Sequence, residues 1–156
     1  MYSFSSLISN YCLICVGIAW ILAQIIKIFT GYFAGDEKFS VTKFFCGTGG
    51  MPSSHSATVM ALLVSAAIQY GFAHFNVAVS FLLAIIVMND AMGVRYETGK
   101  QAKVINELVK EIFSGRSPDV NKNLKELVGH TPIQVFVGAF LGAAVPFIVN
   151  LFYNIV

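Results

Sequence analysis

Residues 47–72 read GTGGMPSSHSATVMALLVSAAIQYGF, a glycine-rich and hydroxyl-rich turn followed at once by an apolar segment. Glycines such as Gly50 allow a turn to point its backbone amides inward. Pro52 ends any preceding helix, and Ser53 or Ser54 can cap the next one. Because the first amides and the dipole of a helix favour negative charge, the stretch predicts a helix that starts at an anion site, where a phosphate would fit.

The composition of the 156-residue chain indicates an integral membrane protein. It is 56% hydrophobic and 12% charged, whereas soluble domains are about 45–50% apolar and about 25% charged. Four apolar runs can each cross about 30 Å of hydrocarbon. These runs are Leu7–Phe29, Ser54–Phe72, Phe75–Val94 and Pro132–Val156. No Pro/Ser-rich linker or repeat divides the chain, so we expect one domain, 1–156, folded as an all-α bundle of four transmembrane helices.

The positive charges predict how the bundle is oriented. Four spans put segments 30–53 and 95–131 on one side of the membrane, and all 10 Lys and Arg residues lie in these segments or at Lys27 beside them. By the positive-inside rule this side is cytoplasmic, and both termini face the opposite side. The first span lacks the basic flank and cleavage site of a signal peptide, so we expect it to be retained. A net charge of +2 without interleaved basic and aromatic residues gives no indication of nucleic-acid binding.

An amphipathic helix is predicted between the third and fourth spans. Apolar residues recur there at helical spacing, opposite a charged face. The apolar residues are Val104, Ile105, Leu108, Val109, Ile112 and Phe113, and the charged residues are Lys100, Lys103, Glu107, Lys110 and Glu111. Such a helix can lie at the interface on anionic headgroups, or it can pack as a lid over the ends of the spans.

Two histidines lie at helix starts on the same predicted side of the membrane. His55 falls in the first turn of the second span, and His130 directly precedes the fourth. There Thr131 is the expected cap, Pro132 takes the first helical position, and Gln134 completes a capping box. Either histidine alone could simply bond to local backbone, but the pair favours a functional site. The third histidine, His74, lies on the opposite face and is left out of the site.

Asp90 and Lys27 are charged residues close to or within apolar spans. An ionised carboxylate in hydrocarbon is costly unless it has a partner, so we expect Asp90 to face the interior. A salt bridge with Arg95 would satisfy both groups, but i, i+5 spacing is poor on a continuous helix, so a functional role is favoured. Lys27 can either extend to headgroups or turn inward to neutralise a phosphate.

Small residues indicate packing. Gly138 and Gly142 form a small-xxx-small pattern, which permits close approach by another helix of the chain or by a second subunit in a homodimer. Cys12 and Cys15 lie in an apolar run and are predicted to be buried packing groups rather than a redox or zinc site. Cys46 leaves the number of cysteines odd.

The polar residues together indicate phosphoryl transfer through a histidine intermediate. One neutral imidazole would attack phosphorus, a carboxylate would orient it, and a second imidazolium would protonate the leaving oxygen. Cationic and backbone donors would hold the non-bridging oxygens. The candidate residues are Lys27, Gly50, Ser53, Ser54, His55, Asp90, Arg95 and His130. This scheme requires no metal and no cofactor, although two histidines and one aspartate could also bind a divalent cation.

The motifs resemble a known family. Pro52-Ser53-Ser54-His55 resembles the Pro-Ser-Gly-His signature of type-2 phosphatidic acid phosphatases, or lipid phosphate phosphatases, which share a core with vanadium-dependent haloperoxidases. The closer resemblance is to their divergent branch. The matching blocks occur in order at 49–57, 90–95, 101–106 and 124–132.

The resemblance assigns roles to the candidate residues. It implies that His55 is the general acid and His130 the nucleophile, with Asp90 as its orienting partner. Arg95 and Lys27 would bind phosphate. The sequence departs from the ordinary family in two places, because no Arg-Pro accompanies Lys27 and because Gln134, not Asp, follows His130.

We therefore predict a membrane phosphatase that hydrolyses a lipid phosphomonoester or pyrophosphate at the cytoplasmic ends of the spans. The alternative is a non-catalytic membrane protein that binds lipid headgroups or a partner through the same pocket. A small transporter is the third candidate, but the outer halves of the spans carry almost no charge to line a path.

Overall fold

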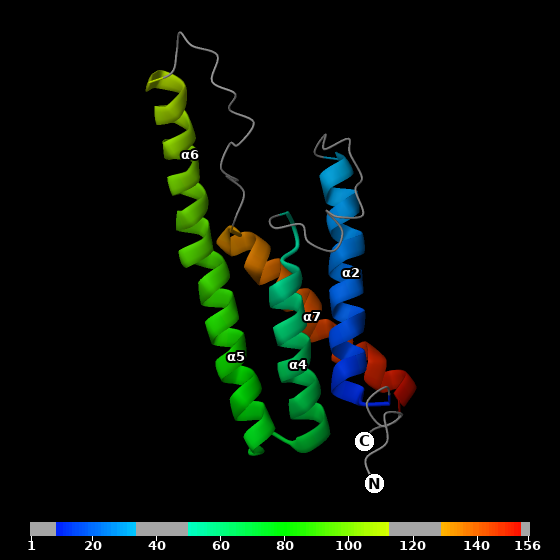
Figure 1. The fold of residues 1–156 in the computed structure, drawn as a ribbon. Helices are drawn as coiled ribbons and strands as arrows, with labels where there is room; N and C mark the ends of the chain where they lie inside the picture. Colours follow the sequence, from blue (N-terminus) through cyan, green and yellow to red (C-terminus); the bar gives the residue numbers. More distant parts are fainter. Residues whose placement is uncertain (1–8, 34–49, 113–128, 154–156) are drawn as a thin grey trace.

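The computed structural model describes residues 9–33, 50–112 and 129–153, and their regular structure is helical. The helices are α2 (Tyr11–Phe33), α4 (Ser54–Tyr70), α5 (Phe75–Met92), α6 (Val94–Ile112) and α7 (Pro132–Tyr153). The prediction of an all-α membrane bundle is confirmed (Figure 1). Glycines 47 and 49, Cys46, Phe113 and most of the block at 124–132 lie outside the described residues.

Three described helical segments are long and apolar enough to cross a membrane: Tyr11–Gly31, Phe75–Lys110 and Pro132–Tyr153. Four spans were predicted, and α4 is not among these three. Its 17 residues rise about 26 Å at about 1.5 Å per residue, less than the hydrocarbon thickness of about 30 Å. The helix is short because Ser53 caps its start and Gly71, at a φ of 81°, ends it.

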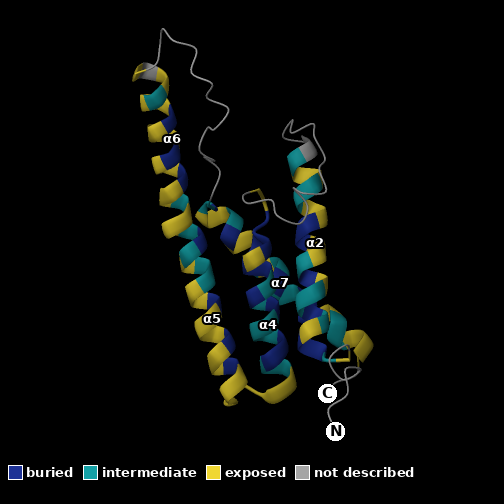
Figure 2. Ribbon diagram, viewed as in Figure 1, coloured by how far each residue is buried: buried dark blue, intermediate teal, exposed yellow. Residues whose placement is uncertain are grey.

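The short helix α4 is the centre of the bundle. It packs against α2, α5 and α7, and α7 crosses it from behind in Figure 1. Its sides are mostly buried or half-buried, while the outer sides of α2 and α5 are exposed (Figure 2). The helix that carries His55 is therefore held by neighbours on several sides.

Gly138 and Gly142 allow α7 to approach α4 closely. A Cβ atom added to Gly138 would collide with the carbonyl of Ser53, and one added to Gly142 would collide with the carbonyl of Ala57. Both glycines are buried. Of the two partners predicted for the small-xxx-small pattern, a helix of the same chain is therefore the one observed. A homodimer stays a prediction, and α4 already occupies the face that these glycines offer.

Small side chains and a few internal hydrogen bonds hold the end of the bundle where α2 begins. Tyr11 Oη donates to Pro146 O at 2.7 Å, and Cys12 Sγ donates to Gln69 Oε1 at 3.2 Å. Cys12 and Cys15 are free and buried, which confirms that they pack as core groups. The rings of Tyr11 and Tyr153 are 5.7 Å apart, so α2 starts where α7 ends.

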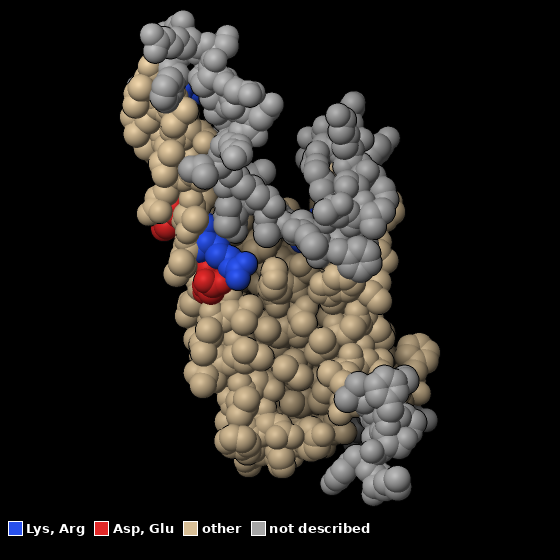
Figure 3. All heavy atoms as spheres, viewed as in Figure 1, with Lys and Arg blue, Asp and Glu red and all other residues tan. Residues whose placement is uncertain are grey.

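Large apolar side chains cover the outer surface of the bundle. Exposed residues include Phe29, Phe81, Ile86, Phe140 and Phe147. The face in Figure 3 is uncharged over most of the bundle, and its charged groups gather where α5 meets α6 and farther along α6. An apolar surface of this extent suits contact with lipid tails.

The predicted amphipathic helix exists, but it begins earlier than its periodicity indicated and is joined to α5 at Gly93. It continues from the end of α5 and extends away from α2, α4 and α7 (Figure 1), which does not fit the lid alternative. Its apolar residues Val104, Ile105, Leu108 and Ile112 are exposed. The headgroup alternative stays a prediction.

Candidate functional site

The turn before α4 is fixed by its own hydroxyls and by α7. Ser53 caps the helix, because its Oγ accepts hydrogen bonds from Ser56 N at 3.4 Å and from Ser56 Oγ at 3.0 Å. Ser53 N in turn donates to Gln134 O at 3.0 Å. Ser53 is fully buried, so its side chain serves as the cap of α4. A contact of Ser53 with substrate stays a prediction.

Lys27 turns inward from α2 onto this turn. Its Nζ donates to Ser54 Oγ at 3.4 Å, and its aliphatic chain lies against Gly50, where an added Cβ would be 3.1 Å from Lys27 Cγ. Gly50 has a φ of 86°, a conformation that favours glycine. Thr30 Oγ1 donates to Met51 O at 2.6 Å and ties the turn to α2. Of the two alternatives for Lys27, the inward one is observed.

The start of α7 confirms the predicted capping box. Thr131 N donates to Gln134 Oε1 at 3.0 Å, and Gln134 N donates to Thr131 Oγ1 at 3.4 Å. The same Gln134 Oε1 lies 3.3 Å from His130 Nδ1. This contact was not predicted, although the i, i+4 spacing of the two residues is a signal that could have indicated it.

The backbone ahead of α7 lies against the junction of α5 and α6. His130 N donates to Ala91 O at 3.1 Å. A Cβ on Gly129 would collide with the backbone of Arg95 and Tyr96. A glycine is therefore required at 129 for this approach. The contact places Arg95 close enough to His130 for its charge to act on the imidazole.

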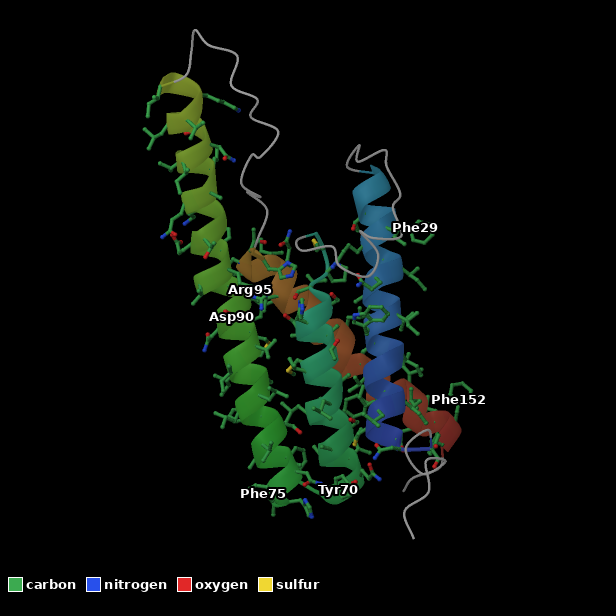
Figure 4. All side chains as sticks on the ribbon, viewed as in Figure 1. Phe29, Tyr70, Phe75, Asp90, Arg95 and Phe152 are labelled. Atoms are coloured by element: carbon green, nitrogen blue, oxygen red, sulfur yellow. The ribbon has the colours of Figure 1, made fainter. Side chains whose placement is uncertain are left out.

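Asp90 forms the salt bridge that the sequence did not favour. Arg95 Nε lies 2.5 Å from Asp90 Oδ2, with both side chains partly exposed, at 49% and 40%. Figure 4 shows the two residues together where α5 meets α6. The spacing rule for a continuous helix does not apply because Gly93 separates the helices. The expectation that Asp90 faces the interior is wrong, and its catalytic role stays a prediction.

The two predicted histidines are neighbours. The ring centroids of His55 and His130 are 6.4 Å apart, with the ring planes at 56°. His55 is exposed, whereas His130 is buried. Burial lowers the pKa of His130 below the usual 6.5; the Gln134 hydrogen bond opposes this shift, and the charges of Lys27, His55 and Arg95 add to it. His130 is therefore a neutral imidazole near pH 7.

His74 lies apart from this cluster, as predicted. Its Nδ1 accepts a hydrogen bond from Asn76 N at 3.2 Å, and its ring stacks on Tyr70 at 5.0 Å. Tyr70 and Phe75 mark that end of the bundle in Figure 4, opposite Asp90 and Arg95. Among the residues that the structure describes, no three His, Cys, Asp or Glu side chains form a group that could hold a metal ion.

The sequence of the chain matches a known protein family. Residues 8–145 match the model of the Divergent PAP2 family. The chain belongs to the divergent PAP2 family. It is also 38% identical over 157 residues to the uncharacterized membrane protein YuiD of Bacillus subtilis (strain 168), across 94% of this chain and 98% of that protein. No solved structure matches.

Membership of the divergent PAP2 family confirms the resemblance drawn from the motifs. The matched range includes every candidate residue from Lys27 to His130, and Gln134 as well. The chain is thus a membrane protein of the divergent PAP2 family with two histidines side by side at the helix starts of one bundle end.

Proposed function

We propose that this protein is a membrane phosphatase that hydrolyses a phosphomonoester or pyrophosphate of a lipid through a phosphohistidine. The observation that carries the proposal is the pair of imidazole rings 6.4 Å apart at the starts of α4 and α7, with Lys27 turned inward beside them. A nucleophile and a proton donor for phosphoryl transfer need such proximity.

The reaction has two steps. His130 attacks phosphorus as a neutral imidazole, the bond from phosphorus to the lipid oxygen breaks, and protonated His55 gives its proton to that oxygen. A water then attacks the phosphohistidine, His55 takes the proton of this water, and phosphate and His130 are released. A bound phosphate favours protonation of the exposed His55 before the first step.

Cations and backbone donors stabilise the transferring phosphoryl group. Lys27 reaches the turn that starts α4, whose first amides and dipole also attract the anion. Arg95 donates to Asp90 through Nε, and its two terminal amino groups can donate to phosphate oxygens. In this scheme Asp90 orients Arg95.

The surroundings of the site favour a lipid as substrate. The site lies at one end of a bundle whose outer surface is covered by large apolar side chains, and a phosphate bound there is at the level of lipid headgroups. We propose that this end is cytoplasmic, since by sequence every Lys and Arg is either Lys27 or a residue of segments 30–53 and 95–131, which connect the predicted spans on one side.

The test is release of inorganic phosphate from lipid phosphates and pyrophosphates by the purified full-length protein, with and without EDTA. We expect turnover that survives EDTA and falls about 100-fold or more in His55→Ala and His130→Ala. His74→Ala is the matched control and should retain activity. Folded protein that binds these lipids without releasing phosphate would instead support the non-catalytic alternative.

A further inference from the structure

We infer that Gln134 is the positioning residue of His130 and holds it in the tautomer that carries its proton on Nδ1 and leaves Nε2 free to attack. The inference rests on the proposed function for the role of His130 as nucleophile. The tautomer itself follows from hydrogen bonds in the structure.

The backbone of Thr131 determines the orientation of the Gln134 side chain. Its amide oxygen and nitrogen can be exchanged by a flip, so the neighbours must decide which atom lies where. Thr131 N is a backbone donor and lies 3.0 Å from Gln134 Oε1. Because a backbone N–H cannot accept a hydrogen bond, the atom that faces it must be the amide oxygen.

The amide oxygen of Gln134 determines which nitrogen of His130 carries the proton. The same Oε1 atom lies 3.3 Å from His130 Nδ1. An amide oxygen only accepts, so Nδ1 must be the donor. In a neutral imidazole the other nitrogen, Nε2, then holds the lone pair. The main chain at the start of α7 thereby determines, through Gln134, which nitrogen of His130 can act as nucleophile.

The charges around His130 are mostly positive. The positive charges of Lys27 on α2 and Arg95 on α6 disfavour protonation of His130, as does His55 on α4 when it is protonated. The carboxylate of Asp90 is paired with Arg95. The Gln134 amide adds no negative charge, so its hydrogen bond raises the pKa of His130 without cancelling the lowering by burial. A carboxylate at the same position would favour the protonated, non-nucleophilic form.

Variants separate this role from helix capping. Gln134→Glu keeps an oxygen for both bonds and adds charge, whereas Gln134→Leu removes both bonds. Thr131→Ala is the matched control, because it removes the hydroxyl half of the capping box and leaves Thr131 N and the contact between Gln134 and His130 in place.

The experiment is nitrogen NMR of the full-length protein in detergent micelles, labelled with ¹⁵N at histidine and assigned with His55 and His74 variants. In the wild type and in Thr131→Ala we expect His130 protonated at Nδ1. Gln134→Leu should shift the population to the Nε2-protonated form, and Gln134→Glu should raise the pKa of His130 by about one unit or more.

A wild-type His130 protonated at Nε2, or an unchanged tautomer in Gln134→Leu, would overturn the inference. Kinetics add a second readout, since the acid limb of kcat/KM should move to higher pH in Gln134→Glu and stay in place in Thr131→Ala. The NMR result does not depend on turnover. An Nδ1-protonated His130 in a protein without phosphatase activity would therefore overturn the proposed function and leave the tautomer assignment intact.

Discussion

At the end of the bundle marked by Tyr70 and Phe75, His74 caps α5 with its own ring, because its Nδ1 accepts a hydrogen bond from Asn76 N. At the opposite end, Ser53 caps α4 and Thr131 caps α7. His55 and His130 are next to these caps but do not form them. Instead, their ring centroids are 6.4 Å apart, with the ring planes tilted by 56°.

The comparison shows what frees a histidine for chemistry. A capping histidine accepts a hydrogen bond from a backbone amide with its lone pair, so this nitrogen is not available for catalysis. Where a serine or threonine supplies the cap, the neighbouring imidazole keeps a nitrogen for other partners. All three histidines of this chain lie at helix starts, and the residue that does the capping distinguishes them.

The largest expected effect is the loss of kcat when either histidine of the site is replaced, and its dependence on the leaving group distinguishes His130 from His55. His130→Ala should lower kcat on the order of 1,000-fold or more for any phosphate ester. His55→Ala should be as harmful with a lipid alkoxide as leaving group but much less so with 4-nitrophenyl phosphate, whose leaving group needs no proton. Steady-state kinetics with both substrates measure the difference. Equal losses in the two variants on both substrates would contradict the assigned roles.

The second prediction concerns the contact that holds α4 against α7. Gly142→Ala places a methyl group on the carbonyl of Ala57, whereas Gly17→Ala meets nothing within 4 Å. We expect Gly142→Ala to destabilise the protein by about 1–3 kcal/mol and to lower phosphate release. Gly17→Ala should be neutral or slightly stabilising. Thermal unfolding in detergent measures both, and similar melting temperatures would argue against the close contact.

The third prediction compares two lysines. Lys27→Met should lower kcat/KM about 10- to 100-fold through weaker phosphate binding, because it removes a charged donor at the turn before α4. Lys100→Met should act like the wild type, since Lys100 is exposed and pairs with Glu97 on α6. Phosphate release at several substrate concentrations gives both values. A full loss in Lys100→Met would place phosphate binding on α6.

The smallest expected effect is on how the free energy of unfolding depends on pH. Burial lowers the pKa of His130 in the folded protein below 6.5, so below this pH the unfolded chain binds more protons and stability falls. The loss should reach up to about 1.4 kcal/mol per pH unit. Denaturation between pH 7 and 5 should show a shallower dependence in His130→Gln. An equal slope in that variant would assign the acid sensitivity to other groups.

Local features of the structure were predictable from the sequence. The caps at Ser53 and Thr131, the capping box at Gln134 and the helix starts next to His55 and His130 depend on residues within one turn of each other. The family resemblance followed from these segments together with the blocks at 90–95 and 101–106. Local sequence rules therefore identified the two histidines of the site.

Tertiary contacts account for what the sequence did not predict. Gly93 joins α5 to α6 and permits the salt bridge between Asp90 and Arg95, which the spacing rule for a continuous helix did not favour. The bond from His130 N to Ala91 O crosses between segments far apart in sequence. The contact between Gln134 and His130 was not predicted, because the capping box already accounted for a polar side chain at position 134.

The central claim is that His130 is the nucleophile and His55 its acid partner. It is tested most directly by trapping the intermediate, with alkaline quenching of the protein during turnover of a ³²P-labelled lipid phosphate, followed by mapping of the label. The account predicts an alkali-stable label on His130 that is absent in His130→Ala and present in His74→Ala. A label on His55, or steady turnover with no labelled histidine, would contradict it.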